Sequence, residues 1–112
     1  MKESKIQSAI IDALCLHKDV TWCMVVTSGG FKVRGSYIQI GRFFDSNHDL
    51  KAGVSDIIGQ LKDGRFFCIE VKKPKEKPTD EQLYFLQMVK DSGGVSGWAD
   101  NIADALNIIR IS

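Results

Sequence analysis

The spacing of apolar residues changes along the chain and divides it into segments with different expected structures. Between residues 3 and 18, apolar positions recur at three- and four-residue steps, which predicts an amphipathic helix. Its expected buried stripe is Ile6, Ile10, Ala13, Leu14 and His17. Residues 20–27, VTWCMVVT, are rich in β-branched and aromatic side chains, which predicts a strand that ends before Gly29 and Gly30.

The middle of the chain contains two predicted pairs of extended segments. Residues 31–41, FKVRGSYIQIG, predict two short arms around a turn near residues 34–36, and the polar residues 42–55 predict a loop. Two apolar segments, residues 55–61 and 65–73, then flank Lys62-Asp63-Gly64 and predict a β-hairpin. Pro74 and Pro78 are expected to stop the second strand and open a loop.

The last third predicts a helix, a strand and a second helix. Thr79 and Gln82 have the spacing of a capping box at the start of a helix that ends at Gly93-Gly94. Its expected inward positions are Leu83, Leu86, Met88 and Val89. Residues 95–99, VSGWA, predict a strand, and Asp100 or Asn101 is expected to cap a helix that buries Ile102, Ala105, Leu106 and Ile109. This order predicts one α/β domain over residues 1–112, a mixed sheet flanked by helices.

Composition mainly excludes classes of protein. With 112 residues, 44% of them hydrophobic and 26% charged, the chain suits one soluble domain with a modest core. No apolar run is long enough to span a membrane and the first ten residues lack a signal-peptide core, so we expect a cytoplasmic protein. The three cysteines have no C-x-x-C spacing, which disfavours a disulfide framework or structural zinc site. Their apolar neighbours predict burial of Cys15, Cys23 and Cys68, and His17 and His48 are too isolated for a zinc site.

The net charge of +1 does not indicate a nucleic-acid partner, but the basic residues are unevenly distributed. The segment KKPKEKP, residues 72–78, contains four lysines and one glutamate, and on its own it is typical of a solvated loop. Further basic residues in the middle of the chain are Lys32, Arg34, Arg42 and Lys51.

Charged residues interrupt the apolar hairpin. Glu70 and Lys72 are two residues apart in the strand FFCIEV-K, so their side chains share one face, whereas Val71 between them faces the core. A two-residue loop at Asp63-Gly64 would put Asp56 and Glu70 on opposite faces of the sheet. A three-residue loop over residues 62–64, with the third residue in the left-handed conformation, would instead place them directly across from each other. Glycine at that third position favours the second register.

Two adjacent carboxylates repel each other and are costly to bury without compensation. Lys72 can offset one charge, whereas a divalent cation offsets both, and hard oxygen ligands suit Mg²⁺ or Mn²⁺. The alternative is a buried Glu70–Lys72 ion pair with Asp56 capping a loop.

This pattern resembles the virus-type replication-repair nuclease (VRR-NUC) family of the PD-(D/E)xK superfamily, in its small stand-alone form. The similarity covers most of the chain: an early helix with Glu3, then KAGVSDIIG, CIEVKKP, TDEQLYFLQMVKDSGG and VSGWADNIADAL. The proline that precedes the aspartate in the superfamily is replaced here by Ser55. The resemblance implies a restriction-endonuclease-like core.

The resemblance also implies an active site formed by Glu3, Asp56, Glu70, Lys72 and Gln82. It implies that Asp56, Glu70 and the backbone carbonyl of Val71 hold Mg²⁺, for which Mn²⁺ can substitute, with Glu3 as a further ligand, through water or to a second ion. Glu3 and Gln82 each have a local explanation as well, as a first-turn acid and a capping residue.

Small members of this family resemble homodimeric, metal-dependent endonucleases that cut branched DNA, such as four-way (Holliday) junctions or flaps. By this resemblance we expect a bacterial protein, or one of a phage-infected host cell. The expected phosphate contacts are Lys32, Arg34, Arg42, Lys51, Lys73, Lys75 and Lys77. Three alternatives remain: a sequence-specific endonuclease of restriction type, a non-catalytic DNA-binding relative, and an interaction module that needs no metal.

Overall fold

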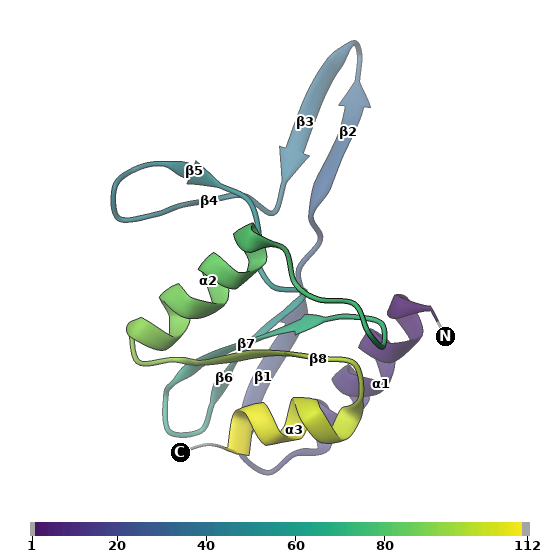
Figure 1. Ribbon diagram of the computed structural model, residues 1–112, viewed down its shortest axis with the longest axis vertical. Coiled ribbons are helices and arrows are strands. Elements are labelled where there is room, and N and C mark those ends of the chain that lie inside the picture. Colours follow the sequence, from purple (N-terminus) through teal and green to yellow (C-terminus); the bar gives the residue numbers. More distant parts are fainter. Residues whose placement is uncertain (1, 111–112) are drawn as a thin grey trace.

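The computed structural model describes residues 2–110 and forms a mixed sheet with helices on both faces (Figure 1). Its helices are α1 (Glu3–Leu16), α2 (Asp80–Asp91) and α3 (Ile102–Arg110). Its strands are β1 (Val20–Val25), β2 (Gly29–Val33), β3 (Ser36–Ile40), β4 (Phe43–Phe44), β5 (Leu50–Lys51), β6 (Ile57–Leu61), β7 (Phe66–Val71) and β8 (Val95–Ala99). The α/β class predicted from the sequence is therefore confirmed.

The main sheet has the strand order β1-β6-β7-β8. Strands β1, β6 and β7 pair antiparallel, whereas β7 and β8 pair parallel because α2 carries the chain back along the sheet. One face packs against α1 and α3, in a core that includes Ile10, Ile69 and Ile109. The other face packs against α2 through a smaller cluster around Cys68 and Leu86. Neighbouring residues of β7 thus point to opposite layers.

The turn between β6 and β7 adopts the predicted three-residue form. Gly64 has a φ of +97°, its N–H donates to the Leu61 carbonyl at 2.9 Å, and the Leu61 N–H donates to the Arg65 carbonyl at 2.9 Å. In this register Ile57 pairs with Ile69. The sequence-based choice between the two registers is confirmed, and it places Asp56 opposite Glu70.

Strands β2 and β3 form a hairpin that projects away from the main sheet (Figure 1). A two-residue turn joins them, with φ values of +51° at Arg34 and +82° at Gly35. The two predicted arms are confirmed, and β1 ends at Val25, before the glycine pair. However, Gly29 and Gly30 belong to β2 and pair with β3, so the arms begin two residues earlier than expected.

The prediction of a loop over residues 42–55 is wrong in part, because β4 and β5 form a small hairpin there. The ring of Phe43 contacts that of Phe85 on α2, with centroids 5.1 Å apart. The Asp45 carboxylate accepts hydrogen bonds from the backbone N–H of Asn47 and Asp49 and from the Tyr84 hydroxyl. These bonds lower the pKa of Asp45. Two-residue strands are too short to produce a detectable alternation in the sequence.

Other expectations about burial need correction. Leu83 is 44% exposed and Phe85 is buried instead, because the inward stripe of α2 follows positions 82, 85, 86 and 89. Ile102, at the first turn of α3, is also exposed. Cys15 is exposed, whereas Cys68 is buried as expected and Cys23 is half-buried, with its pKa raised to about 11 by burial and by Cys15. Within residues 2–110, no helix has the length and apolar character required to cross a membrane.

Candidate active site

Asp56 and Glu70 lie side by side where β6 begins and β7 ends. The Val71 N–H donates a 2.8 Å hydrogen bond to Asp56 Oδ2, and the Val26 N–H, just after β1, donates to the Asp56 carbonyl at 2.8 Å. The Asp56 side chain and backbone are therefore bonded to the strand ends on both sides, which fixes the carboxylate beside Glu70.

Glu70 is a buried carboxyl group, with only 2% of its surface exposed. Burial, together with the hydrogen bond and negative charge of Asp56, raises its pKa to about 9, whereas the positive charge of Lys72 acts in the opposite direction. Its Oε2 atom has no hydrogen-bond partner among residues 2–110. An unpartnered buried carboxyl oxygen beside a second carboxylate is an unfavourable arrangement unless a proton or a cation compensates it.

Lys72 and Glu3 complete the charged cluster from two other positions. The Lys72 N–H donates to the Ala99 carbonyl of β8 at 3.0 Å, which keeps the end of β7 in the sheet. The pKa of Glu3 is raised overall, mainly by burial and then by the negative charge of Asp56, and the positive charge of Lys72 offsets part of this increase. The first turn of α1 is therefore within electrostatic reach of the carboxylate pair.

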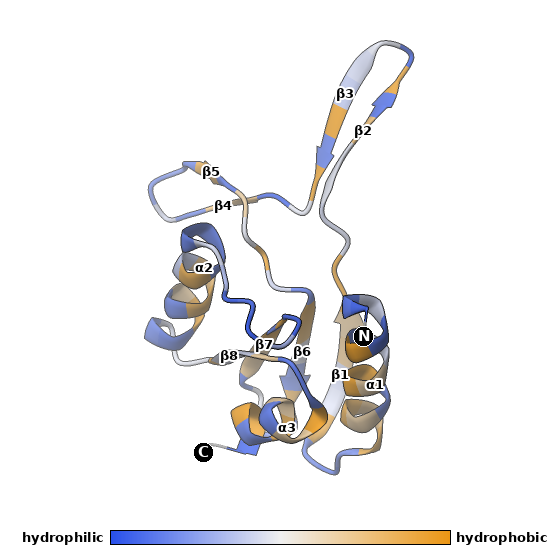
Figure 2. Cartoon of the chain, turned by 45° about the vertical axis from the view of Figure 1, so that its right-hand side comes forward, coloured by the Kyte–Doolittle hydropathy of each residue, from blue (hydrophilic) through white to orange (hydrophobic). Residues whose placement is uncertain are grey.

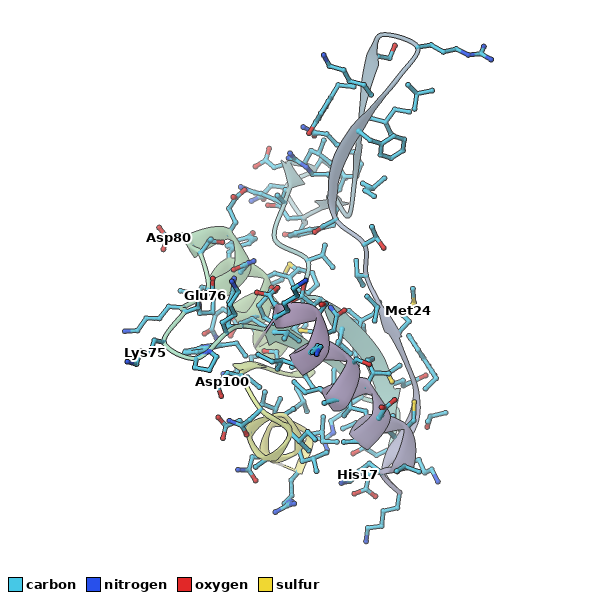
Figure 3. The ribbon with its side chains drawn as sticks, turned by 90° about the vertical axis from the view of Figure 1, so that its right-hand side faces the viewer. His17, Met24, Lys75, Glu76, Asp80 and Asp100 are labelled. Atoms are coloured by element: carbon cyan, nitrogen blue, oxygen red, sulfur yellow. The ribbon has the colours of Figure 1, made fainter. Side chains whose placement is uncertain are left out.

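The lysine-rich segment after β7 folds back toward that same first turn. Glu76 accepts a 3.0 Å hydrogen bond from the Lys73 N–H, and its negative charge contributes to the raised pKa of Glu3. Figure 3 shows Glu76 beside the beginning of α1, with Lys75 pointing away from the body of the protein. Lys73, Lys75 and Lys77 are exposed at this end of the sheet.

Gln82 is part of the predicted capping box, which is confirmed. The Thr79 N–H donates to Gln82 Oε1 at 2.9 Å, and the Gln82 N–H donates to Thr79 Oγ1 at 3.2 Å. Gln82 also lines the cavity that contains Asp56 and Glu70. Because Gln82 lies on the sheet-facing stripe of α2, it can both cap the helix and line the cavity.

The cavity over the carboxylate pair measures about 310 Å³. Its walls come from α2, from the loop before β6, and from the β2–β3 hairpin and the residues after it, including Tyr37, Gln39 and Arg42. Tyr37 and Gln39 were not predicted as site residues. The available signal was the alternation of polar and apolar residues over 30–40, which indicates that every second side chain of the hairpin faces one way.

The predicted phosphate-contacting residues are spread over three regions. Arg42 lines the cavity, Lys32 lies along the β2–β3 hairpin and Arg34 lies at its turn. Lys51, on β5, lies over the Tyr84 ring, 5.4 Å from its centroid. The three lysines after β7 follow the end of that strand, and Lys73 is close enough to Glu3 to lower its pKa.

The donor atoms fit a hard divalent cation. Asp56 and Glu70 supply carboxylate oxygens, one of them unpartnered. The Val71 N–H points toward Asp56, and its carbonyl shares that side of the strand because the Lys72 N–H points to β8. Among the described residues no group of three or more His, Cys, Asp or Glu side chains is arranged to hold a metal. The oxygen donors that lie together are two carboxylates and one backbone carbonyl, and ligation of a metal by them or by Glu3 stays a prediction.

The family model described as the VRR-NUC domain matches residues 1–100 of the chain. The chain belongs to the VRR-NUC family. It is therefore a member of a nuclease family, and the mixed sheet with its flanking helices is consistent with the nuclease fold of that family. No curated protein matches the chain at a significant level. The acidic pair of this VRR-NUC chain lies in the segment that the family model covers.

Proposed function

We propose that this VRR-NUC chain is a Mg²⁺-dependent, structure-selective endonuclease that hydrolyses phosphodiester bonds in branched DNA, such as four-way junctions or flaps. The observation that carries the proposal is the buried Glu70 carboxyl, which lies beside Asp56 with its Oε2 unpartnered among residues 2–110. A cation among these oxygens would offset both negative charges, which Lys72 alone cannot do.

Asp56, Glu70 and the Val71 carbonyl would hold the Mg²⁺ ion. The bound ion would polarise the scissile phosphate and lower the pKa of a water molecule. Because the pKa of Glu70 is raised to about 9, this carboxyl carries a proton at neutral pH and must release it before it can act as a ligand. Glu70 therefore couples metal binding to proton release.

Lys72 orients or deprotonates the attacking water and balances the charge that develops on the phosphate. Lys72 directly follows β7 and lowers the pKa of Glu70, so its charge acts on the carboxylate pair, although Lys72 is not among the residues that line the cavity. Glu3, whose pKa Lys72 also lowers, would bind the metal through a water molecule or hold a second ion. Gln82 lines the cleft and positions the nucleophile or Lys72.

The basic residues bind the DNA backbone rather than read its sequence. Arg42 in the cavity wall, Lys32 on the hairpin and the lysines after β7 can all contact phosphates, which carry no base information. Selectivity then comes from the shape of the branched substrate. Two copies related by a two-fold axis would match the symmetry of a four-way junction, so the proposal includes a homodimer.

The test is incubation of the protein with four-way, flap, fork and linear duplex DNA in Mg²⁺, Mn²⁺ or EDTA. We expect branched DNA to be cut in either metal and no DNA to be cut in EDTA. Asp56→Ala and Lys72→Ala abolish cutting, whereas Lys62→Ala, an exposed lysine at the far end of the same hairpin, leaves it unchanged. Circular dichroism confirms that each variant folds. Cutting that survives both site substitutions contradicts the proposal.

A further inference from the structure

The β2–β3 hairpin has two chemically different faces. Gly30 pairs with Gln39 and Lys32 pairs with Tyr37, so these four residues share one face. Phe31 pairs with Ile38 on the opposite face, which is apolar. The ribbon in Figure 2 shows this alternation as successive hydrophilic and hydrophobic segments along both strands.

The mixed polar face is the one directed toward the acidic pair. Tyr37 and Gln39 line the same cavity as Asp56 and Glu70, and the cavity wall continues to Arg42. The hairpin therefore presents an aromatic side chain and an amide to any molecule whose phosphate lies over the carboxylates.

The ring of Tyr37 occupies space that the absence of a side chain at Gly30, on the facing strand, leaves open. A Cβ atom added at Gly30 would lie 2.7 Å from Tyr37 Cε1 and would also collide with the hydroxyl end of the ring. The phenol ring therefore lies across the bare backbone of Gly30, and 62% of Tyr37 is exposed. An exposed tyrosine on a strand is common, but this one also lines an acidic cavity, in a position that depends on the missing side chain of Gly30.

We propose that Tyr37 stacks on an unpaired nucleobase next to the scissile phosphate and that Gly30 positions the ring for this contact. The proposal rests on the nuclease function proposed above. Only an unpaired base can be displaced from its neighbours to offer its face to an aromatic ring, because both faces are covered inside a duplex. The substrate class is therefore DNA with unpaired nucleotides at the branch, such as a flap or fork, in preference to a fully paired junction.

Steady-state cleavage of a flap substrate tests the role of the ring. Tyr37→Ala is expected to raise KM about tenfold with little change in kcat, because base–aromatic stacking stabilises bound DNA. Tyr37→Phe retains the ring and restores the wild-type KM. Phe44→Ala is the matched control, since Phe44 is 70% exposed on the neighbouring β4 strand and does not line the cavity.

Gly30→Ala tests the positioning role, because the added methyl group displaces the Tyr37 ring. It is expected to raise KM as Tyr37→Ala does, and the double variant is no worse than either single variant, since both remove one contact. Melting temperatures measured by circular dichroism verify that the hairpin variants remain folded.

A direct signal for stacking comes from 2-aminopurine placed at the unpaired position of the flap. Its fluorescence is quenched when it stacks, so quenching on the wild-type protein and on Tyr37→Phe, but not on Tyr37→Ala, supports the proposal. If the wild-type protein cleaves the flap and Tyr37→Ala shows the same KM and the same quenching, the proposed role of Tyr37 is overturned. The proposed nuclease function is not affected by that result. Absence of cleavage of every DNA by the wild-type protein in Mg²⁺ overturns the nuclease function itself.

Discussion

The backbone N–H of Val71 donates a 2.8 Å hydrogen bond to Oδ2 of Asp56. A side-chain carboxylate thus replaces the backbone carbonyl of the residue before Asp56, which would accept this bond if β6 extended further. Asp56 has two functions as a result: it completes the end of the sheet, and it holds a negative charge beside Glu70. Substitutions that separate the hydrogen bond from the charge can distinguish them.

Asp56→Asn is expected to keep the fold and lose the activity. The amide oxygen can still accept from Val71, whereas the lost charge removes a proposed metal ligand and should reduce cleavage by about 100-fold or more. Asp56→Ala leaves the Val71 N–H unpaired and is expected to destabilise the protein by about 1–3 kcal/mol. Urea unfolding and cleavage assays measure the two effects. Equal stability of both variants contradicts the structural role of the hydrogen bond.

The pKa of Glu70 predicts that the metal-free protein loses stability as the pH rises. The unfolded chain releases this proton near its ordinary pKa of 4.5, whereas the folded chain keeps it up to about 9. The stabilisation by the proton is complete below pH 4.5 and is lost as the pH rises through about 9. In EDTA, Glu70→Gln is expected to be more stable than wild type at pH 8, by on the order of 2 kcal/mol.

Thermal unfolding of both proteins in EDTA between pH 5 and pH 9 measures this difference. The wild-type melting temperature should fall across the range, and that of Glu70→Gln should fall less. Lys62→Ala serves as a surface control. Parallel curves for wild type and Glu70→Gln would show that this carboxyl ionises with an ordinary pKa in the folded state.

The two roles of Gln82 can be separated through its capping partner. Thr79→Ala removes the hydroxyl acceptor of the Gln82 N–H and is expected to destabilise α2 by about 1 kcal/mol. Thr79 also lines the cavity, but the substitution leaves the Gln82 amide in place, so cleavage is expected to be retained under folding conditions. Gln82→Ala removes the acceptor of the Thr79 N–H, so it should also destabilise α2. Because it removes an amide from the cavity too, it should in addition reduce kcat. Denaturant unfolding measures the stability of both variants, and single-turnover cleavage measures their activity. If both variants lower kcat equally, capping alone explains Gln82.

The β6–β7 turn is expected to depend on its glycine for backbone reasons alone. A Cβ atom at Gly64 would meet nothing within 4 Å, but the φ of +97° is strained for any other residue. Gly64→Ala should cost about 1–2 kcal/mol of stability and leave kcat unchanged at low temperature, because the turn lies at the far end of the hairpin from Asp56. An unchanged free energy of unfolding would contradict this.

Turn and capping chemistry made part of the site predictable. Glycine at the third turn position indicated the register that puts Asp56 opposite Glu70, and the Thr79–Gln82 spacing indicated where α2 begins. Both signals come from residues close together in the sequence, so they can be interpreted without knowledge of tertiary packing. The position of Gln82 over the cavity follows once the start of α2 and its inward stripe are known.

The rest depended on contacts between distant segments. The β4–β5 hairpin is held to α2 by contacts between Phe43 and Phe85 and between Asp45 and Tyr84. No local sequence pattern predicts these contacts. Tyr37 reaches the cavity only because the β2–β3 hairpin lies beside it. Leu83 was expected to be buried because it is apolar, but the sheet covers only the stripe that contains Phe85 and Leu86.

The short connection between β6 and β7 also affects the order in which the molecule assembles. A hairpin closes within microseconds, whereas β8 can join β7 only after the intervening helix has crossed the sheet. The two like charges therefore meet early, before the surrounding layers shield them. Because neither carboxyl is buried at that stage, their repulsion should slow refolding at any pH above the ordinary carboxyl pKa of 4.5, and an ion bound between them would hasten the formation of the native sheet.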